Sequence, residues 1–461
     1  MLRTGLVQRV LDSADDVEIV LVSPLVDDAA FVREFSHPRV RFEHLPPHRP
    51  SGLEGRLLAL IQASYIDSGV SEAVQIRRQE AVAKRSIRLI RAKRLLAATL
   101  APSMVRRESR YQLIDRLVSH PAAEELFDRY RPVLLVTSSP GLILAEVPLL
   151  RTAARRGVWS MAVDASWDNF TNKLLPVRRV NRLLVWNEVM KRQAVELHGY
   201  RPEEVQVTGP PHWDVYFRGA RGSTRDTFFR RIGADPSRKL VTLTTTPFEL
   251  YPHYDHVVRV MTDAMARGLW PGPCQLLVRV HPRDDLDRYQ GLAGAPHVIV
   301  EKPFRTTVRS GDGLAVDITA ESQQHLADTL RYSDVVVQVA STIAVEAAIF
   351  DRPVVNISFD GETPAEWTRS ARRYLRFTHF ANVLRHGAVK PAASPAQLVS
   401  AVAEYLTDPT ADAEGRRRVV QEQCQFVDGR SSDRVKAAVV DTLNERLGSP
   451  VGQPVAMRRS K

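Results

Sequence analysis

The chain has 461 residues, of which 44% are hydrophobic and 25% charged, enough apolar side chains for at least two packed domains. Its formal net charge of +11 is compatible with nucleic acid, an anionic membrane surface or phosphorylated small molecules as partners. Two cysteines, Cys274 and Cys424, exclude a disulfide framework, and the sequence has no Walker loop, no G-x-G-x-x-G motif and no charge-free stretch long enough to span a membrane. These features predict a cytoplasmic α/β protein.

The N-terminal residues alternate between helix and strand. We predict a helix over 2–11, a strand over 17–23, a helix over 29–35 and a strand over 40–45. Doubly wound domains begin with a strand, whereas this chain begins with a helix. We therefore expect that a first strand is missing because the true start lies upstream of Met1.

Residues 51–130 predict helices only. The stretch from Arg77 to Arg110 contains eleven Lys or Arg and two Glu, with apolar residues at helical spacing. One interpretation is an insertion whose basic side faces solvent. The other is that the basic helix over 77–110 contacts an anionic membrane or a phosphorylated acceptor. Nucleic acid is disfavoured, because aromatic residues hardly interleave with the charge.

A polar loop follows the predicted strand over 158–163. This loop, 164–173, contains two carboxylates, two amides, two hydroxyls and a lysine. Loops at the carboxyl ends of strands line the ligand site of an open α/β sheet, so we expect this loop to contact a ligand. The alternative is a turn closed by Asx-type hydrogen bonds.

Polar residues also follow predicted strands in the second half. The strand over 276–280 ends in R-x-H-P-R, and Arg suits a diphosphate because its planar fork binds two oxygens. The strand over 335–339 is followed by Ala340, Ser341 and Thr342 and then by a helix that carries Glu346. Hydroxyls and free amides at a helix start can bind a phosphate, and Glu346 can accept hydrogen bonds from a ribose. The alternative is an ordinary strand-helix-strand unit in which Ser341 caps the helix and Glu346 faces solvent.

Several motifs together resemble a known family. They are the order sDvvv…ST…EA…rPvvni, the R-x-H-P-R cluster, a G-x-P-x-x-D segment from Gly209, and W-D-N-x-T-x-K in the polar loop. The chain resembles GT-B glycosyltransferases of the bacterial surface-polysaccharide branch, near CDP-glycerol glycerophosphotransferases and UDP-N-acetylglucosamine 2-epimerases, over about residues 133–434. It departs from the CDP-glycerol enzymes because it lacks their H-G-T histidine in the N-terminal half.

The resemblance implies the fold class α/β, GT-B: two doubly wound parallel-sheet domains facing a cleft, with a helical insertion in the first. The first domain would cover 1–210, including the insertion at 51–130. A linker would cover 211–220, the nucleotide-sugar-binding domain 221–445, and a disordered tail 446–461.

The resemblance also implies the site residues. Ser341 and Thr342 would contact the donor diphosphate and Glu346 the ribose, and the other donor-binding candidates are Thr246, Arg279, His281 and Arg283. The acceptor side would carry Asn169, Thr171 and Lys173. We expect Asp168 to act as general base, with Trp167 excluding water and raising its pKa, and with Asp164 and His212 as the other catalytic candidates.

The predicted function is sugar transfer from a nucleotide diphosphate sugar to a cell-envelope glycan or lipid-linked acceptor, with inversion of configuration. We expect no cofactor and no metal ion, since basic side chains and helix amides can neutralise the leaving diphosphate; the D-x-D at Asp285 is discounted. The protein would act in the cytoplasm, peripherally at the inner membrane face. Alternatives are CDP-glycerol-type transfer, nucleotide-sugar epimerisation and a non-catalytic scaffold.

Overall fold

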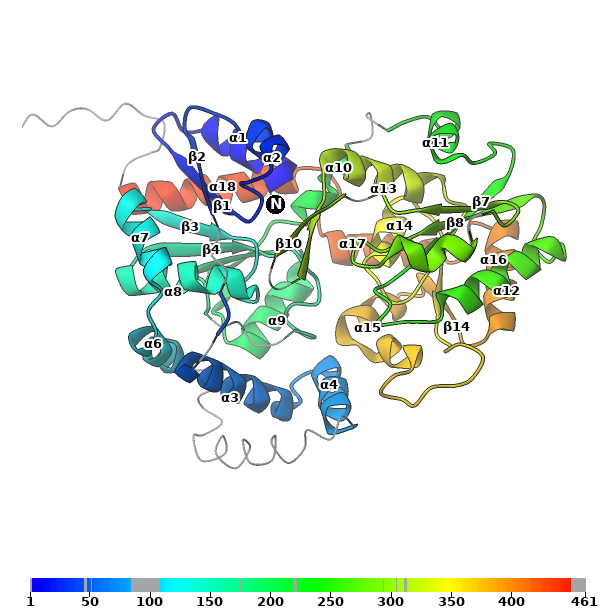
Figure 1. The fold of residues 1–461 in the computed structure, drawn as a ribbon, viewed down its shortest axis with the longest axis horizontal. Helices are drawn as coiled ribbons and strands as arrows, with labels where there is room; N and C mark the ends of the chain where they lie inside the picture. Colours follow the sequence, from blue (N-terminus) through cyan, green and yellow to red (C-terminus); the bar gives the residue numbers. More distant parts are fainter. Residues whose placement is uncertain are drawn as a thin grey trace, which may run out of the picture.

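The computed structural model describes residues 2–44, 48–50, 52–83, 108–173, 176, 178–218, 222–292, 294–303, 305–310 and 313–448. Two parallel sheets form two domains that lie side by side, the first half of the chain in one and most of the second half in the other (Figure 1). The predicted architecture of two α/β domains is confirmed. Residues 84–107 of the basic stretch predicted at 77–110, and residues 449–461 of the tail predicted at 446–461, lie outside the described residues.

The first domain contains a four-stranded parallel sheet with the order β3-β4-β5-β6. Its strands are β3 (Leu134–Thr137), β4 (Trp159–Val163), β5 (Arg182–Val185) and β6 (Val205–Val207). The connecting helices α8 (Val147–Arg156) and α9 (Glu188–His198) each end at a glycine with positive φ, 70° at Gly157 and 69° at Gly199. Because only glycine adopts this conformation at little cost, these glycines stop the helices and return the chain to the sheet. Short 3-10 turns η3 (Leu144–Glu146) and η4 (Pro202–Glu204) precede α8 and β6.

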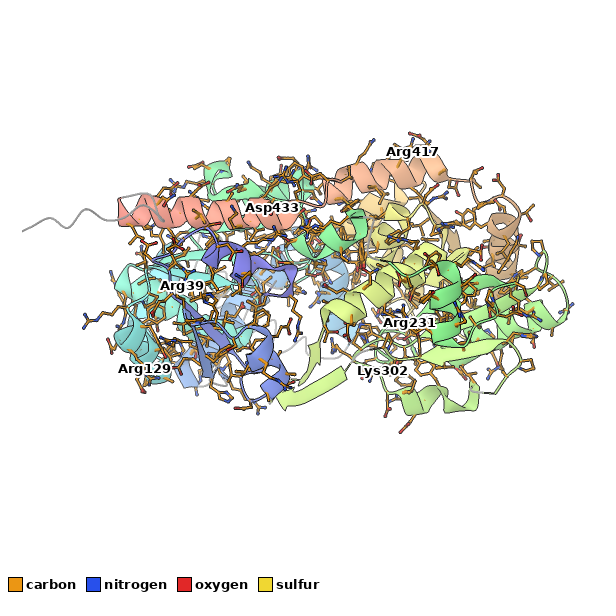
Figure 2. The ribbon with its side chains drawn as sticks, turned by 90° about the horizontal axis from the view of Figure 1, so that it is seen from above. Arg39, Arg129, Arg231, Lys302, Arg417 and Asp433 are labelled. Carbon is orange, nitrogen blue, oxygen red and sulfur yellow. The ribbon has the colours of Figure 1, made fainter. Side chains whose placement is uncertain are left out.

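The N-terminal elements are those predicted. They are η1 (Leu2–Thr4), α1 (Leu6–Leu11), β1 (Ile19–Ser23), α2 (Ala29–Glu34) and β2 (Val40–His44). Strands β1 and β2 pair in parallel from Ile19 opposite Val40. The guanidinium of Arg39 donates a hydrogen bond of 2.7 Å to the carbonyl of Leu11, which joins the end of α1 to the start of β2 (Figure 2).

Between β2 and β3 the described residues are helical, as predicted. The helices are α3 (Gly52–Ser68), α4 (Glu72–Ala83), α6 (Glu108–Leu117) and α7 (Pro121–Tyr130). Helix α4 lies between the domains: Arg77 donates to Asn172 (3.0 Å) in the first domain, and Glu80 accepts from Arg373 (3.0 Å) in the second. The start of the expected basic helix therefore takes part in the contact between the domains.

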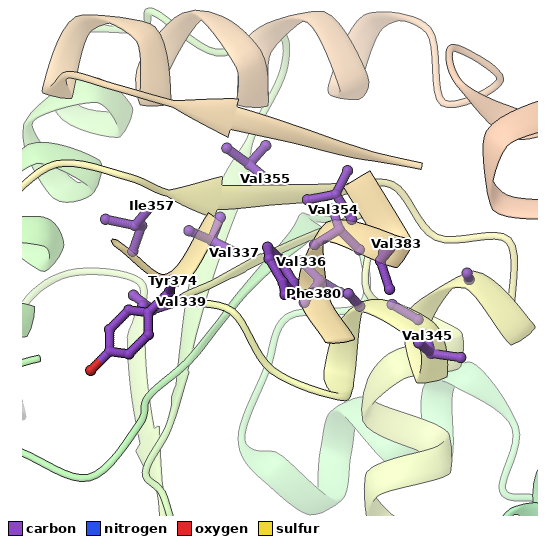
Figure 3. Close-up of a cluster of buried hydrophobic side chains, with 14 of the residues drawn as sticks. Val336, Val337, Val339, Val345, Val354, Val355, Ile357, Tyr374, Phe380 and Val383 are labelled. Atoms are coloured by element: carbon purple, nitrogen blue, oxygen red, sulfur yellow. The ribbon is translucent and has the colours of Figure 1, made fainter. Parts of the chain in front are cut away.

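The second domain contains a six-stranded parallel sheet with the order β14-β13-β12-β7-β8-β9. Its strands are β7 (Lys239–Thr244), β8 (Cys274–Arg279), β9 (Val298–Glu301), β12 (Val335–Gln338), β13 (Val354–Ile357) and β14 (Val389–Ala392). Its helices are α11 (Arg225–Ile232), α12 (Tyr254–Ala266), α13 (Ala320–Tyr332), α14 (Ile343–Ile349), α15 (Thr378–Leu384), α16 (Pro395–Thr407), η6 (Leu286–Leu292) and η7 (Ala371–Arg376). Central strands are covered on both faces, and Val336, Val337, Val354 and Val355 are fully buried (Figure 3).

An antiparallel hairpin, β10 (Arg305–Ser310) and β11 (Gly313–Asp317), was not predicted. It lies between the two domains in Figure 1. Ile318, directly after β11, accepts a hydrogen bond of 3.3 Å from Arg3 of the first domain.

The C-terminal helices return the chain to the first domain. Helix α17 (Ala413–Cys424) contacts α14, whereas α18 (Ser431–Leu447) lies along the first domain (Figure 2). Val435 and Val439 of α18 pack with Val163 of the first sheet. The predicted boundaries placed 221–445 in the second domain, whereas α18 buries its apolar face on the first sheet and continues two residues into the predicted tail, to Leu447.

The linker is anchored to the start of α18. It forms η5 (Pro211–Trp213) and α10 (Asp214–Phe217). The buried carboxylate of Asp214 accepts hydrogen bonds of 2.8 Å from the amides of both Ser431 and Ser432. At Gly209 (φ 81°) a Cβ would lie 2.4 Å from Oγ of Ser431, so only glycine allows this approach.

Asp214→Ala should lower the free energy of unfolding by about 1–3 kcal/mol, because two buried amides lose a charged acceptor. Urea unfolding measures the effect. The matched control is Asp433→Ala. Asp433 lies in the first turn of α18, next to Ser431 and Ser432, and its side chain is 31% exposed and pairs with Arg9. That change should cost about 0–1 kcal/mol. Equal losses in the two variants would contradict the role given to Asp214.

Candidate donor and acceptor site

The carboxyl ends of β7, β8 and β12 meet at one edge of the second sheet. From β7 the chain proceeds to β8 and β9 on one side, and β12 lies on the other side of β7. The strand order therefore reverses between β7 and β12, which is the position where open α/β sheets bind ligands. The candidates Thr246, His281, Ser341 and Thr342 all follow these three strands, so the structure brings them together.

His281 is held by its neighbours. Its amide donates to Oγ1 of Thr245 (2.8 Å), and its Nδ1 accepts from the amide of Arg283 (3.1 Å). Burial, followed by the charge of Arg283, lowers the pKa of His281 to about 4. The ring is therefore neutral at pH 7, with its proton on Nε2 as a donor. The side chain of Arg283 is exposed.

The turns beside His281 present hydroxyl groups. Oγ1 of Thr246 accepts from the phenol of Tyr254 at 3.1 Å, and the same phenol accepts from the amide of Thr246 at 2.7 Å. Across the switch point, Oγ of Ser341 accepts from the amide of Ile343 at 3.3 Å. Ala340 has a φ of 28°, and its amide is held by Oδ1 of Asn356 at 2.7 Å. This conformation directs the chain into Ser341 and Thr342.

A row of polar side chains crosses the last residues of five adjacent strands. The register pairs Gln338 of β12 with Asn356 of β13, and pairs Arg279 of β8 with both Thr244 of β7 and Glu301 of β9. Arg279 is 4% exposed and donates to Glu301 at 2.8 Å. Arg279 was expected at the diphosphate, but its charge is paired in the interior of the sheet.

Glu346 is buried in α14 rather than exposed to solvent. Its Oε2 accepts a hydrogen bond of 2.6 Å from the phenol of Tyr216, which comes from the linker. Burial raises the pKa of Glu346, against the opposing effects of Tyr216, Thr342 and Arg279. Nothing in the sequence pattern singled out Tyr216, because its contact crosses 130 positions.

Asp164 directly follows β4 and is 1% exposed. Its Oδ1 accepts from the amide of Ser166 (3.2 Å) and from the side chain of Asn169, as in the predicted Asx-type turn. Its Oδ2 has no hydrogen-bond partner among the described residues. Burial raises the pKa of Asp164 to about 7. Thr171, also predicted in this loop, is fully buried, and its carbonyl accepts from Ser71 at 2.6 Å.

Asp168 has the opposite shift. Its carboxylate accepts from Ser166 (2.5 Å) and Asn172 (3.1 Å) and lies 3.4 Å from Nζ of Lys173. Burial by itself raises the pKa of Asp168, but Lys173, His379 and the hydrogen bonds from Ser166 and Asn172 together outweigh burial and lower the pKa to about 2. The expectation that Trp167 raises this pKa is therefore wrong, because these neighbours have the larger combined effect.

His212 approaches the loop through an aromatic contact. Its ring lies 5.2 Å from that of Trp186, whose Nε1 donates to the carbonyl of Asp164 at 2.8 Å. Burial lowers the pKa of His212 to about 3.

Sequence reasoning also missed His379 of α15, whose ring lies 5.1 Å from Trp167. This contact places the polar loop at 164–173 of the first domain against the second domain. A groove of about 470 Å³ lies elsewhere, along β6 and Phe426, and contains none of the predicted site residues.

The two domains and their polar strand ends define a GT-B fold. The UDP-GlcNAc 2-epimerase of Neisseria meningitidis, solved with UDP-GlcNAc, is similar at a TM-score of 0.51 and 9% identity, covering 96% of this chain and 96% of that chain. The epimerase of Methanocaldococcus jannaschii is similar at a TM-score of 0.48 and 12% identity, covering 91% and 95%. The wall teichoic acid polymerase TagF is similar at a TM-score of 0.46 and 12% identity, covering 68% and 73%.

The sequence profile described as CDP-Glycerol:Poly(glycerophosphate) glycerophosphotransferase matches residues 155–441, more than half of the chain. The chain belongs to this family of transferases. A search of curated proteins found no match. Among the described residues, no helix combines the length and the apolar character needed to cross a bilayer.

The two loop aspartates should respond oppositely to replacement by asparagine. The pKa of Asp164 is about 7 in the folded state, so Asp164 binds its proton more tightly there than in the unfolded chain. The resulting loss of folding stability is complete above pH 7 and disappears as the pH falls towards 4. Asp164→Asn should therefore stabilise the protein at pH 8, on the order of 1–4 kcal/mol, and have little effect at pH 4.

Asp168→Asn is the matched control. In the wild-type protein the lowered pKa of Asp168 stabilises the folded state above pH 4, and this contribution is lost as the pH falls through 2. The variant should lose about 1–2 kcal/mol at pH 8. Urea unfolding at both pH values measures the pair, and destabilisation by Asp164→Asn at pH 8 would contradict the pKa assigned to Asp164.

Proposed function

We propose that this protein transfers a sugar from a nucleoside diphosphate sugar to a hydroxyl group of a cell-envelope glycan or its lipid-linked precursor. The observation that carries the proposal is the convergence of Thr246, His281 and Ser341 at the switch point of the second sheet. Hydroxyls and a neutral imidazole donor in that position suit the oxygens of a diphosphate.

The donor is bound by the second domain. Nε2 of His281, the hydroxyls of Ser341 and Thr342, and the exposed guanidinium of Arg283 contact the diphosphate. Glu346 accepts hydrogen bonds from the ribose. Arg279 is paired with Glu301 within the sheet, so it acts on the diphosphate through its electrostatic field and not by direct contact. These donors offset the charge of the leaving nucleotide, so the reaction requires no metal ion.

The acceptor is activated by the first domain. Asp168 takes the proton of the acceptor hydroxyl while the hydroxyl oxygen bonds to the anomeric carbon of the sugar. The bond from that carbon to the diphosphate breaks at the same time, with inversion of configuration. In the free protein Lys173 keeps Asp168 a weak base. An anionic acceptor draws Lys173 towards its phosphate and so raises the basicity of Asp168. Asn169 and Thr171 support the loop.

The acceptor is a polymer or lipid at the inner membrane face, and the basic stretch at 77–110 attracts its anionic surroundings. Helix α4, where this stretch begins, contacts the polar loop at 164–173, the proposed acceptor loop, through the hydrogen bond from Arg77 to Asn172. A bound acceptor would therefore lie close to Arg77, the first residue of the basic stretch.

Membership of the glycerophosphotransferase family favours a second candidate, transfer of glycerol phosphate from CDP-glycerol. The two reactions break different bonds. Sugar transfer breaks the bond to the anomeric carbon and releases a nucleoside diphosphate. Glycerol-phosphate transfer breaks the bond between the two phosphates and releases CMP.

The released nucleotide distinguishes the candidates. Purified protein with membrane extract as acceptor should release a nucleoside diphosphate from one of a panel of UDP-, GDP-, dTDP- and CDP-sugars. Chromatography of the nucleotides measures the product, and CDP-glycerol is included in the panel. Release of CMP from CDP-glycerol would establish the second candidate and reject the first. Release without acceptor would reject transfer itself.

Two variants should separate the donor site from the base. Glu346→Ala should weaken donor binding by roughly 10- to 150-fold, through loss of a charged hydrogen bond. Asp168→Asn should leave donor binding unchanged and lower turnover by about 100-fold or more. Isothermal titration and acceptor-dependent turnover measure the two effects.

Asp164→Asn and His212→Ala are the controls for the base. Near-normal turnover in Asp168→Asn together with an inactive Asp164→Asn or His212→Ala would move the base to that residue. A product with retained anomeric configuration would reject the general-base mechanism. Glu346→Ala with unchanged donor affinity would falsify the ribose assignment.

A further inference from the structure

Two histidines and a glutamate meet where the helical region joins the first domain. His48 precedes α3, Glu54 lies in the first turn of α3, and His120 precedes α7. One ligating atom from each residue lies within 4.8 Å of the other two. Nε2 of His48 is 3.3 Å, and Nε2 of His120 is 4.0 Å, from Oε1 of Glu54.

The cluster is closed to solvent. The side chains of His48, Glu54 and His120 are 12%, 7% and 8% exposed. Nε2 of His120 has no hydrogen-bond partner among the described residues, although it is directed at the carboxylate. Buried polar nitrogens normally have a hydrogen-bond partner or a bound ion, so the unpartnered Nε2 indicates a missing ligand.

We propose that His48, Glu54 and His120 bind a divalent transition metal ion, with Zn²⁺ as the preferred ion. Imidazole nitrogens and a carboxylate oxygen are ligands of zinc, and three protein ligands leave a fourth position for water. A tetrahedron with bonds of about 2.0–2.1 Å separates its ligand atoms by about 3.3 Å. His48 and Glu54 already have this separation, whereas His120 has to move closer to both, because its Nε2 lies 4.0 Å from Glu54 and the three ligand atoms span up to 4.8 Å.

A cation beside the cluster sets a limit on the affinity. Arg151 of α8 is fully buried, and its Nη1 donates to the same oxygen of Glu54 at 2.5 Å. Its Nε lies 3.8 Å from Asp115, which also lies 3.5 Å from Arg178. Arg151 orients the carboxylate but repels the ion, and Asp115 offsets part of this charge. We therefore expect weaker binding than at a zinc site without an adjacent cation.

The location indicates a structural role. Glu54 and His120 lie near the two ends of the helical region, and Arg151 belongs to the helix on which that region packs. An ion held by these residues would tie the start of α3 to the start of α7. It would also fix the base of α3, which leads into α4 and its contacts with the acceptor loop.

The test uses the full chain after treatment with EDTA and dialysis. Isothermal titration with ZnCl₂ and elemental analysis of the dialysed complex should give one zinc ion per chain. His48→Ala and His120→Ala should each weaken binding by more than the roughly 10- to 100-fold typical of losing an outer-shell partner. His44→Ala is the matched control, because this nearby histidine is 60% exposed and should not matter. Zinc should raise the melting temperature of wild type and His44→Ala only.

Cobalt(II) provides a measurement that needs no variant. The wild-type complex should show the strong visible absorption of four-coordinate cobalt, whereas the weak bands of six-coordinate cobalt would overturn the assignment. Absence of zinc binding to wild type, or unchanged binding in both histidine variants, would also overturn it. Circular dichroism of the zinc-free variants checks their folding, and His120→Gln replaces His120→Ala if the latter unfolds.

Discussion

The contact between Asp214 and the first turn of α18 determines how the two domains are joined. Two buried amides share one carboxylate, and Gly209 lets the linker approach Ser431 closely. The chain therefore crosses between the domains twice at one place. Because the linker is held there, Tyr216 reaches Glu346, and a residue outside the second sheet controls the carboxylate nearest the proposed ribose position.

Burial rather than net charge shapes the electrostatics of the site. Arg279 is buried with Glu301, which also accepts from His325 at 2.8 Å, so the cation nearest the strand ends is already paired. His281 stays neutral for the same reason, since burial opposes its protonation. The proposed donor site therefore relies on directed hydrogen bonds, with the exposed Arg283 supplying the mobile charge.

The helical region contacts both the polar loop at 164–173 of the first domain and the second domain. Ser71 and Arg77 bind the loop at Thr171 and Asn172, while Glu80 binds Arg373 of the second domain. A change in the spacing of the domains would act on the loop through α4. The proposed metal cluster lies at the other end of this region, at the base of α3 and against α8.

Local pattern predicted central strands of both sheets, such as those at 158–163, 276–280 and 335–339, but not the edge strand β14 or the β10–β11 hairpin. The valine run at 335–339 and the helix with Glu346 are recognisable because burial on both faces selects short β-branched runs, and a parallel fold requires a helix after each strand. The family resemblance implied that Thr246, His281 and Ser341 contact one donor, and the strand order of the second sheet makes the strands that precede them neighbours. The pKa values of Asp164 and Asp168, the pairing of Arg279 and the place of α18 depended on contacts between distant segments. A sequence pattern records spacing along one element, whereas desolvation and charge pairing are set by whichever segment covers a side chain, and only the tertiary structure decided that.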